Sequence, residues 1–187
     1  MKFITIFSVL FVSVMAKSCI HEWRIYHGTT EPLLYGVFVG NFQSNNPAFI
    51  GRGIHENLRV TGRIQTVNPP GLYHVSFGKI HHIPKGVEYL VKNPNYDYKW
   101  ISSSNGEYVE NAISPGYTPG LELHFVGRMK IDGRTYYGKV LPNVGMYYED
   151  GNQKEVLASQ YQIIVCNNPT MDNFGRALPI VLKSQQL

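Results

Sequence analysis

The sequence has 187 residues and a formal net charge of +4 at pH 7. The positive charges are dispersed rather than gathered in runs, which argues against nucleic acid as a partner. The 13 tyrosines and 9 phenylalanines are interspersed with 18 glycines and 11 prolines, a composition typical of short strands joined by turns.

The first residues have the layout of a secretory signal peptide. Lys2 gives a positive start, an apolar run follows over Phe3–Met15, and the small or polar residues Ala16–Ser18 come next. The apolar run, about 13 residues, is shorter than the roughly 20 that a membrane-spanning helix needs. We therefore expect residues 1–18 to be a signal peptide, cut after Ala16 or Ser18, and the protein to be secreted and extracellular with no membrane span.

The mature chain retains two cysteines, Cys19 and Cys166. In the oxidising environment that a secreted protein meets, two lone thiols tend to pair. We expect a disulfide within one chain, which would stabilise the fold by about 4–5 kcal/mol in the chain-entropy model. Two buried free thiols, or a disulfide between chains, are the alternatives.

The rest of the sequence contains two copies of one unit. Four landmarks of the first copy recur in the same order in the second, with offsets that agree within three residues: Trp23 with Trp100, Phe49–Arg52 with Phe125–Arg128, Gly62–Ile64 with Gly138–Val140, and Val87–Val91 with Tyr161–Val165. Such ordered self-similarity indicates a tandem duplication. The predicted units span residues 19–93 and 94–168, followed by a C-terminal tail over 169–187.

Within each unit the local pattern is that of β-strands. Segments such as Ala48–Ile50, Leu72–Val75 and Gln162–Val165 are short and rich in β-branched and aromatic side chains. After the signal peptide, no window of a dozen residues has a helical period. We predict an all-β fold in which two tandem antiparallel β repeats pack with pseudo-two-fold symmetry.

The repeated landmarks resemble the DM-nine repeat family, whose members carry tandem copies of a similar unit. The family signature combines a Gly-Tyr-Asp-like turn, Leu-Tyr-Val-Gly-Arg-Ala, Pro-Gly-Lys-Val and Tyr-Glu-Val-Leu-Val. The second unit corresponds to it at Gly116–Thr118, Phe125–Arg128, Tyr137–Val140 and Tyr161–Val165. The resemblance covers almost the whole mature chain, and it implies a lectin-like protein that binds mannose-type sugars and acts in innate immunity.

By the same resemblance, a lysine and an aspartate of the family contribute to a sugar site. The lysine corresponds to Lys139, and its first-unit partner is Arg63. The aspartate is replaced by Thr118 in the second unit and by Gln43 or a neighbour in the first. These neutral side chains accept fewer and weaker hydrogen bonds than a carboxylate. The carbohydrate-binding set that the resemblance implies is therefore altered at its acidic position.

Two carboxylates complete the candidate site. Glu56 and Asp132 each stand seven residues before the cation of their unit, Arg63 and Lys139. Solvated turn residues that form weak surface ion pairs would have the same spacing. We expect Lys139 to matter more than Arg63, because a rotating ammonium can meet several sugar hydroxyls, whereas the planar guanidinium suits carboxylates or phosphates.

The histidines and nucleophiles of the sequence point to no further chemistry. His81 and His82 are adjacent, so they would point to opposite faces of a strand. His55 and His74 form no metal-ligand spacing with them, and we expect surface histidines, no metal and no cofactor. Because no nucleophile motif is present either, we expect that the protein is not an enzyme.

The sequence therefore predicts a secreted carbohydrate-binding recognition protein with one potential site in each unit. The alternative is a secreted component of saliva, venom or haemolymph that binds another protein and no sugar, which the missing aspartate favours. The expected partners are glycans or glycoproteins, with a second copy of the chain, in a homodimer, as a further candidate.

Overall fold

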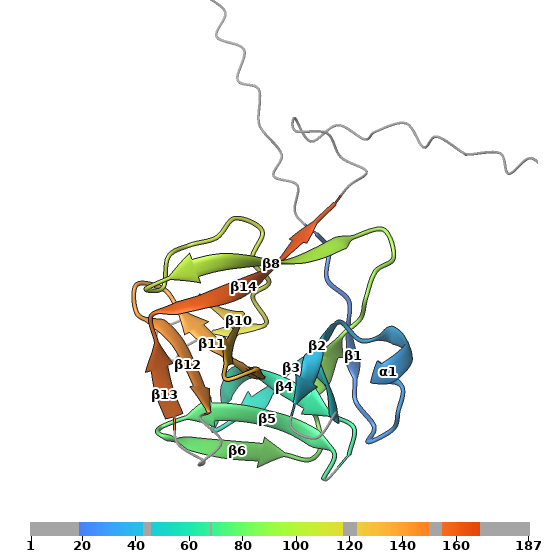
Figure 1. Cartoon of the computed structure of the whole chain (residues 1–187). Coiled ribbons are helices and arrows are strands. Elements are labelled where there is room, and N and C mark those ends of the chain that lie inside the picture. Colours follow the sequence, from blue (N-terminus) through green and yellow to red (C-terminus); the bar gives the residue numbers. More distant parts are fainter. Residues whose placement is uncertain (1–18, 43–45, 68, 118–122, 150–154, 169–187) are drawn as a thin grey trace, which may run out of the picture.

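The computed structural model describes five stretches of the chain (Figure 1): residues 19–42, 46–67, 69–117, 123–149 and 155–168. The predicted signal peptide, the tail over 169–187, Gln43 and Thr118 lie outside the described residues. The described chain forms two seven-stranded antiparallel sheets and one short helix, α1 (Pro32–Tyr35). The predicted all-β fold of two antiparallel repeats is confirmed. No helix in the described part of the chain has the length and apolar character needed to cross a membrane.

The two sheets have the same strand order. In the first, the order is β1-β7-β3-β4-β5-β6, with β2 paired to β3. Its strands are β1 (Trp23–Ile25), β2 (Phe38–Phe42), β3 (Asn46–His55), β4 (Leu58–Gln65), β5 (Gly71–Ser76), β6 (Lys79–Ile83) and β7 (Glu88–Leu90). In the second, the order is β8-β14-β10-β11-β12-β13, with β9 paired to β10. Its strands are β8 (Asp97–Ser104), β9 (Gly116–Tyr117), β10 (Leu123–Ile131), β11 (Arg134–Leu141), β12 (Gly145–Glu149), β13 (Glu155–Ala158) and β14 (Gln160–Asn167).

Every strand of the first sheet thus has a counterpart in the second, seven strands later in the chain. The hairpin turns between β3 and β4 and between β10 and β11 correspond as well. Glu56 and Asn57 have φ angles of 49° and 64°, and Asp132 and Gly133 have 49° and 76°. Two consecutive positive φ angles are those of the tight turn whose twist matches that of the flanking strands. The predicted boundary between the units falls between the end of β7 and the start of β8.

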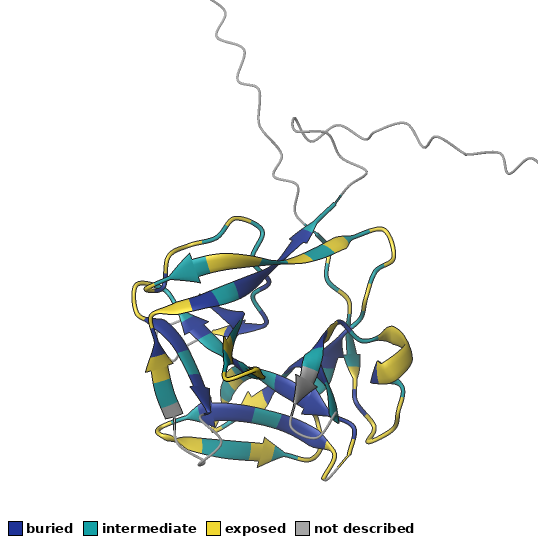
Figure 2. Cartoon of the chain, in the orientation of Figure 1, coloured by how far each residue is buried: buried dark blue, intermediate teal, exposed yellow. Residues whose placement is uncertain are grey.

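The two units contact each other through corresponding strands. β4 lies against β11 and β5 against β12, while β4 contacts β9 and β11 contacts β2. Because β9 is the counterpart of β2, these contacts are reciprocal, as an approximate two-fold axis between the units requires. Tyr137 of β11 donates a 2.8 Å hydrogen bond to the carbonyl of Val39 in β2. Figure 2 shows that the buried residues gather along the strands, while most connecting turns are exposed.

A buried cluster crosses this boundary and joins the two units into one core. The first unit contributes Val37, Val39 and Ile50, and the second contributes Val126 and Ile164. These side chains are apolar and less than a tenth exposed, so their burial holds the sheets together through the hydrophobic effect. The site candidates on β4 and β11 lie beside this core.

Each unit is anchored by an arginine that stacks on a tryptophan and donates to a neighbouring strand. In the first unit, the Arg52 guanidinium lies 4.2 Å from the centre of the Trp23 ring, and its Nε donates to Glu88 at 2.7 Å. In the second unit, the Arg128 guanidinium lies 4.3 Å from the centre of the Trp100 ring, and its Nε donates to Gln162 at 2.9 Å. A guanidinium over a tryptophan ring is held by cation–π attraction. These repeated residues fix the strands of each sheet.

The predicted disulfide is present. Cys19 and Cys166 are bonded, with Cα atoms 6.1 Å apart and a separation of 147 positions in sequence. Cys19 precedes β1, and Cys166 belongs to β14. The bond therefore joins the beginning of the first unit to the last strand of the second.

Candidate functional site

The two cations predicted from the family pattern occupy corresponding places on β4 and β11. Arg63 pairs in register with Tyr73, and Lys139 pairs with Tyr147. The guanidinium lies 5.2 Å from the centre of the Tyr73 ring, and the ammonium lies 5.6 Å from the centre of the Tyr147 ring. Both cations line a cavity of about 20 Å³ between the units, room for about one water molecule. The fold thus brings the two candidates together at the boundary, where separate sites were expected.

Arg63 is committed to a buried ion pair. Its Nη2 lies 3.2 Å from Oε2 of Glu149, and both residues are 6% exposed. Burial lowers the pKa of the guanidinium, and the negative charge of Glu149 acts against that shift. Glu149 belongs to the second unit, so the pair bridges the two sheets. Arg63 therefore has a structural partner that a sugar would have to replace.

Lys139 has different surroundings. It is partly exposed, and its positive charge interacts electrostatically with two buried histidines, His74 and His124. Burial first, and neighbouring charges including Lys139 second, lower the pKa of His74 to about 3 and that of His124 to about 4. Both imidazoles are therefore neutral near pH 7, and Lys139 supplies the positive charge at this position.

The predicted carboxylates do not lie beside these cations. Glu56 and Asp132 are exposed residues of the hairpin turns. Arg63 lies five residues beyond Leu58, the first residue of β4, which corresponds to about 17 Å along an extended strand. In the second unit, Lys139 likewise lies five residues beyond Arg134, the first residue of β11. The sequence spacing was thus no guide to proximity, because an extended strand carries residues steadily apart.

Sequence reasoning missed a cluster of three histidines. His55 ends β3, while His74 of β5 and His81 of β6 are direct cross-strand partners. The ring centres lie between 4.4 and 5.0 Å apart. His82 stacks on Tyr73, with ring centres 4.7 Å apart. The expectation of surface histidines is wrong for His74, which is 2% exposed.

A polar groove on the second sheet was missed as well. It has a volume of about 810 Å³ and is lined by residues of β8, β10 and β14, among them Ser102, Ser104, Arg128, Lys130, Gln160 and Gln162. The run of serines in β8 was the sequence signal that could have indicated it. Hydroxyl, amide and cationic groups on one rigid sheet are suited to polar ligands with many hydroxyls.

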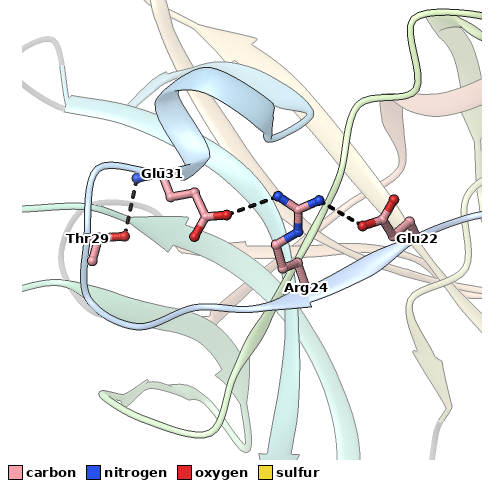
Figure 3. Close-up of polar contacts among 4 residues, drawn as sticks. All are labelled: Glu22, Arg24, Thr29 and Glu31. Carbon is pink, nitrogen blue, oxygen red and sulfur yellow. Dashed lines mark hydrogen bonds and ion pairs between the residues drawn. The ribbon is translucent and has the colours of Figure 1, made fainter.

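An ionic network fixes the segment that leads into α1 (Figure 3). Arg24 of β1 donates from Nη2 to Glu22 at 2.9 Å and from Nη1 to Glu31 at 3.0 Å. The backbone N–H of Glu31 donates to Thr29 Oγ1 at 3.3 Å. The hydrogen bond from Arg24 is the main cause that lowers the pKa of Glu31. These contacts join β1 to the segment that leads into α1.

The surface that α1 presents is apolar. Leu33, Leu34 and Tyr35 are 49%, 77% and 47% exposed. In Figure 2 the helix is almost wholly coloured as exposed. Neighbouring exposed apolar side chains of this size are a common feature of protein-binding surfaces.

Comparisons with known proteins identify the repeat and the fold. The model of the DM9 repeat matches residues 66–158, which begin just after β4 and end with β13. The chain is similar to the crystal structure of the nematode sperm cell motility protein MFP2B, with a TM-score of 0.60 and 15% identity. That match covers 82% of this chain and 48% of the other, so the chain spans about half the length of that protein, and the likeness shows the fold alone. No curated protein matches the sequence.

Proposed function

Because this chain belongs to the DM9 repeat family, we propose that it is a secreted, lectin-like recognition protein that binds glycans or glycoproteins at Lys139. The proposed ligand is a mannose-type sugar, and the proposed setting is innate immunity. The disulfide between Cys19 and Cys166 supports secretion, since such bonds persist in oxidising compartments. That the protein is not an enzyme, and that it forms a homodimer, stay predictions.

The observation that carries this proposal is the pairing of Lys139 with Tyr147. Both side chains are partly exposed and stand on neighbouring strands of one sheet, so their spacing is held by the backbone. A sugar offers an apolar C–H face and a rim of hydroxyls. The ring can pack against the face while the ammonium donates to the hydroxyls.

The proposal places one site in the chain rather than one in each unit, because Arg63 is buried against Glu149. The predicted neutral acceptors Gln43 and Thr118 lie outside the described residues and stay predictions.

The test is a glycan array with the purified mature chain, followed by titration of the best glycan. We expect Lys139→Ala to weaken binding five- to a hundredfold, since losing one donor to a bound polar group costs ~1–3 kcal/mol. Lys85→Ala removes the same charge from an exposed loop and should bind as the wild type does. Melting temperatures of both variants serve as the folding control. Equal affinity of Lys139→Ala and wild type would reject the Lys139 site.

The second candidate function is binding of another secreted protein, which the exposed apolar side chains of α1 favour. Under this alternative the wild type binds no glycan on the array. Leu34→Ser, at the most exposed position of α1, then weakens capture of a protein partner from the fluid into which the protein is secreted. Unchanged capture by Leu34→Ser would reject α1 as the docking surface.

A further inference from the structure

We propose that the first unit binds a divalent transition-metal ion, such as zinc, between His55, His74 and His81. This site shares no residue with the proposed sugar site, although His74 and Lys139 line the same small cavity. Neutral imidazole is a preferred ligand of zinc and of neighbouring divalent ions such as copper and nickel. The three residues come from three strands, so the fold and not local sequence creates the site.

The geometry of the cluster fits a shared ion. One ligand nitrogen from each of the three histidines can be chosen so that all three lie within 4.8 Å of one another. Zinc–nitrogen bonds of 2.0–2.1 Å in a tetrahedral site place the nitrogens roughly 3.3 Å apart. The difference, about 1.5 Å, is within reach of small side-chain rotations. Two of the ligands, His74 and His81, are already opposite each other in register.

The hydrogen bonds of the cluster leave nitrogens available to an ion. His81 Nε2 lies 3.1 Å from the Ser76 carbonyl oxygen, which can only accept, so this nitrogen carries the proton and Nδ1 keeps its lone pair. A backbone carbonyl in that role is the usual way to orient a metal-ligating histidine. Nε2 of His55 and Nε2 of His74 are buried and have no hydrogen-bond partner among the described residues. Buried polar atoms of this kind are costly without a partner, and a bound ion would supply one.

The second unit shows that the fold does not require histidines at these positions. The counterparts of His55, His74 and His81 are Ile131, Tyr148 and Val156, which belong to one hydrophobic cluster. Tyr148 and Val156 are paired in register, as His74 and His81 are. The first unit thus carries an imidazole at each of three positions where an apolar filling is sufficient. A shared ligand explains why the three are found together.

The cluster also has a charged neighbour and an internal control. The Glu56 carboxylate lies 3.9 Å from His55 Nε2, so it can complete the coordination or balance the charge of the ion. His82 stacks on Tyr73, and its Nε2 is hydrogen-bonded to the carbonyl oxygen of Pro70, outside the cluster. Because its imidazole is exposed, a variant of His82 measures how much of the metal binding comes from a surface histidine alone.

The experiment is a zinc titration of the mature chain after treatment with EDTA and dialysis. Isothermal titration calorimetry gives the stoichiometry and affinity, and the visible absorption of bound Co²⁺ reports the geometry. The test variant is His55→Ile/His74→Tyr/His81→Val, which installs the residues of the second unit. The control is His82→Leu, which installs the second-unit residue Leu157 outside the cluster. Circular dichroism and melting in EDTA establish that both variants fold.

We expect the wild type to bind one zinc ion per chain and to melt at a higher temperature with zinc than with EDTA. The triple variant should bind at least a hundredfold more weakly, and His82→Leu within twofold of the wild type. If the triple variant does not fold, His81→Val alone should still weaken binding at least tenfold. The proposal is overturned if the wild type takes up no zinc, if the cluster variants bind as the wild type does, or if His82→Leu removes the binding.

Discussion

The two units share one backbone plan but differ in the chemistry of corresponding positions. Strand order, hairpin turns and the arginine–tryptophan anchor are the same in both. At the boundary, however, Arg63 meets Glu149, whereas the first-unit counterpart of Glu149 is Val75. The three histidines of the first unit likewise correspond to apolar residues in the second. The strands and turns are therefore common to both repeats, while a few substitutions give corresponding positions different charges and side chains.

The largest expected effect comes from breaking the ion pair between Arg63 and Glu149. Arg63→Met should lower the free energy of unfolding by about 3–5 kcal/mol, because it leaves the Glu149 carboxylate buried without its partner. Urea denaturation followed by circular dichroism measures the change. The control is Arg63→Met/Glu149→Val, which gives the second unit the residue that the first already has.

The double variant should regain stability to within about 1 kcal/mol of the wild type, since apolar residues often replace a buried ion pair at little cost. A single variant as stable as the wild type would contradict the importance of the pair. A double variant no more stable than the single one would show that Glu149 is not the group left uncompensated.

The next effect concerns His124, whose counterpart in the first unit is Ala48. Burial, then the charge of Lys139, lower the pKa of His124 to about 4 from 6.5. Between these values the unfolded chain binds the proton and the folded one does not, so stability is present above pH 6.5 and is lost as the pH falls toward 4. The wild type should lose about 3 kcal/mol more than His124→Ala between pH 7 and pH 4.

Denaturation curves at several pH values measure this difference. Gly116 packs against the His124 ring, so His124→Ala also changes packing, but that effect is the same at every pH. Parallel pH profiles of the two proteins would show that His124 is not held neutral in the folded state.

The smallest effect tests the arginine–tryptophan anchor. Glu88→Gln converts the acceptor of Arg52 into the residue type that Arg128 already uses, Gln162. We expect a loss of less than about 1 kcal/mol, because the hydrogen bond remains and a partly exposed ion pair adds little. The salt dependence of stability should also decrease, as measured by denaturation at low and high salt. A loss as large as that of Arg52→Ala would contradict the equivalence of the two anchors.

Much of the fold could be predicted from the sequence alone. The recurrence of Trp23 as Trp100 and of Gly62–Ile64 as Gly138–Val140 indicated two similar units, and the short aromatic and β-branched segments indicated strands. The pairing of Cys19 with Cys166 followed from their being the two thiols of a chain expected in an oxidising compartment. These features are local patterns or direct self-similarity, and each can be recognised without knowing which strands are neighbours.

The candidate sites, in contrast, depended on contacts that only the tertiary structure decided. The sequence identified Lys139 and Arg63 as equivalent, but it did not indicate that Glu149 of the other unit would bury Arg63. It placed Glu56 close to Arg63, although an extended strand separates them. The spacing of the histidines along the chain gave no reason to group them. In the fold, however, cross-strand register pairs His74 with His81, and the end of β3 places His55 beside both. Sequence similarity reports that two positions are equivalent; their partners are set by sheet register and by the packing of one unit on the other, which join residues far apart in the chain.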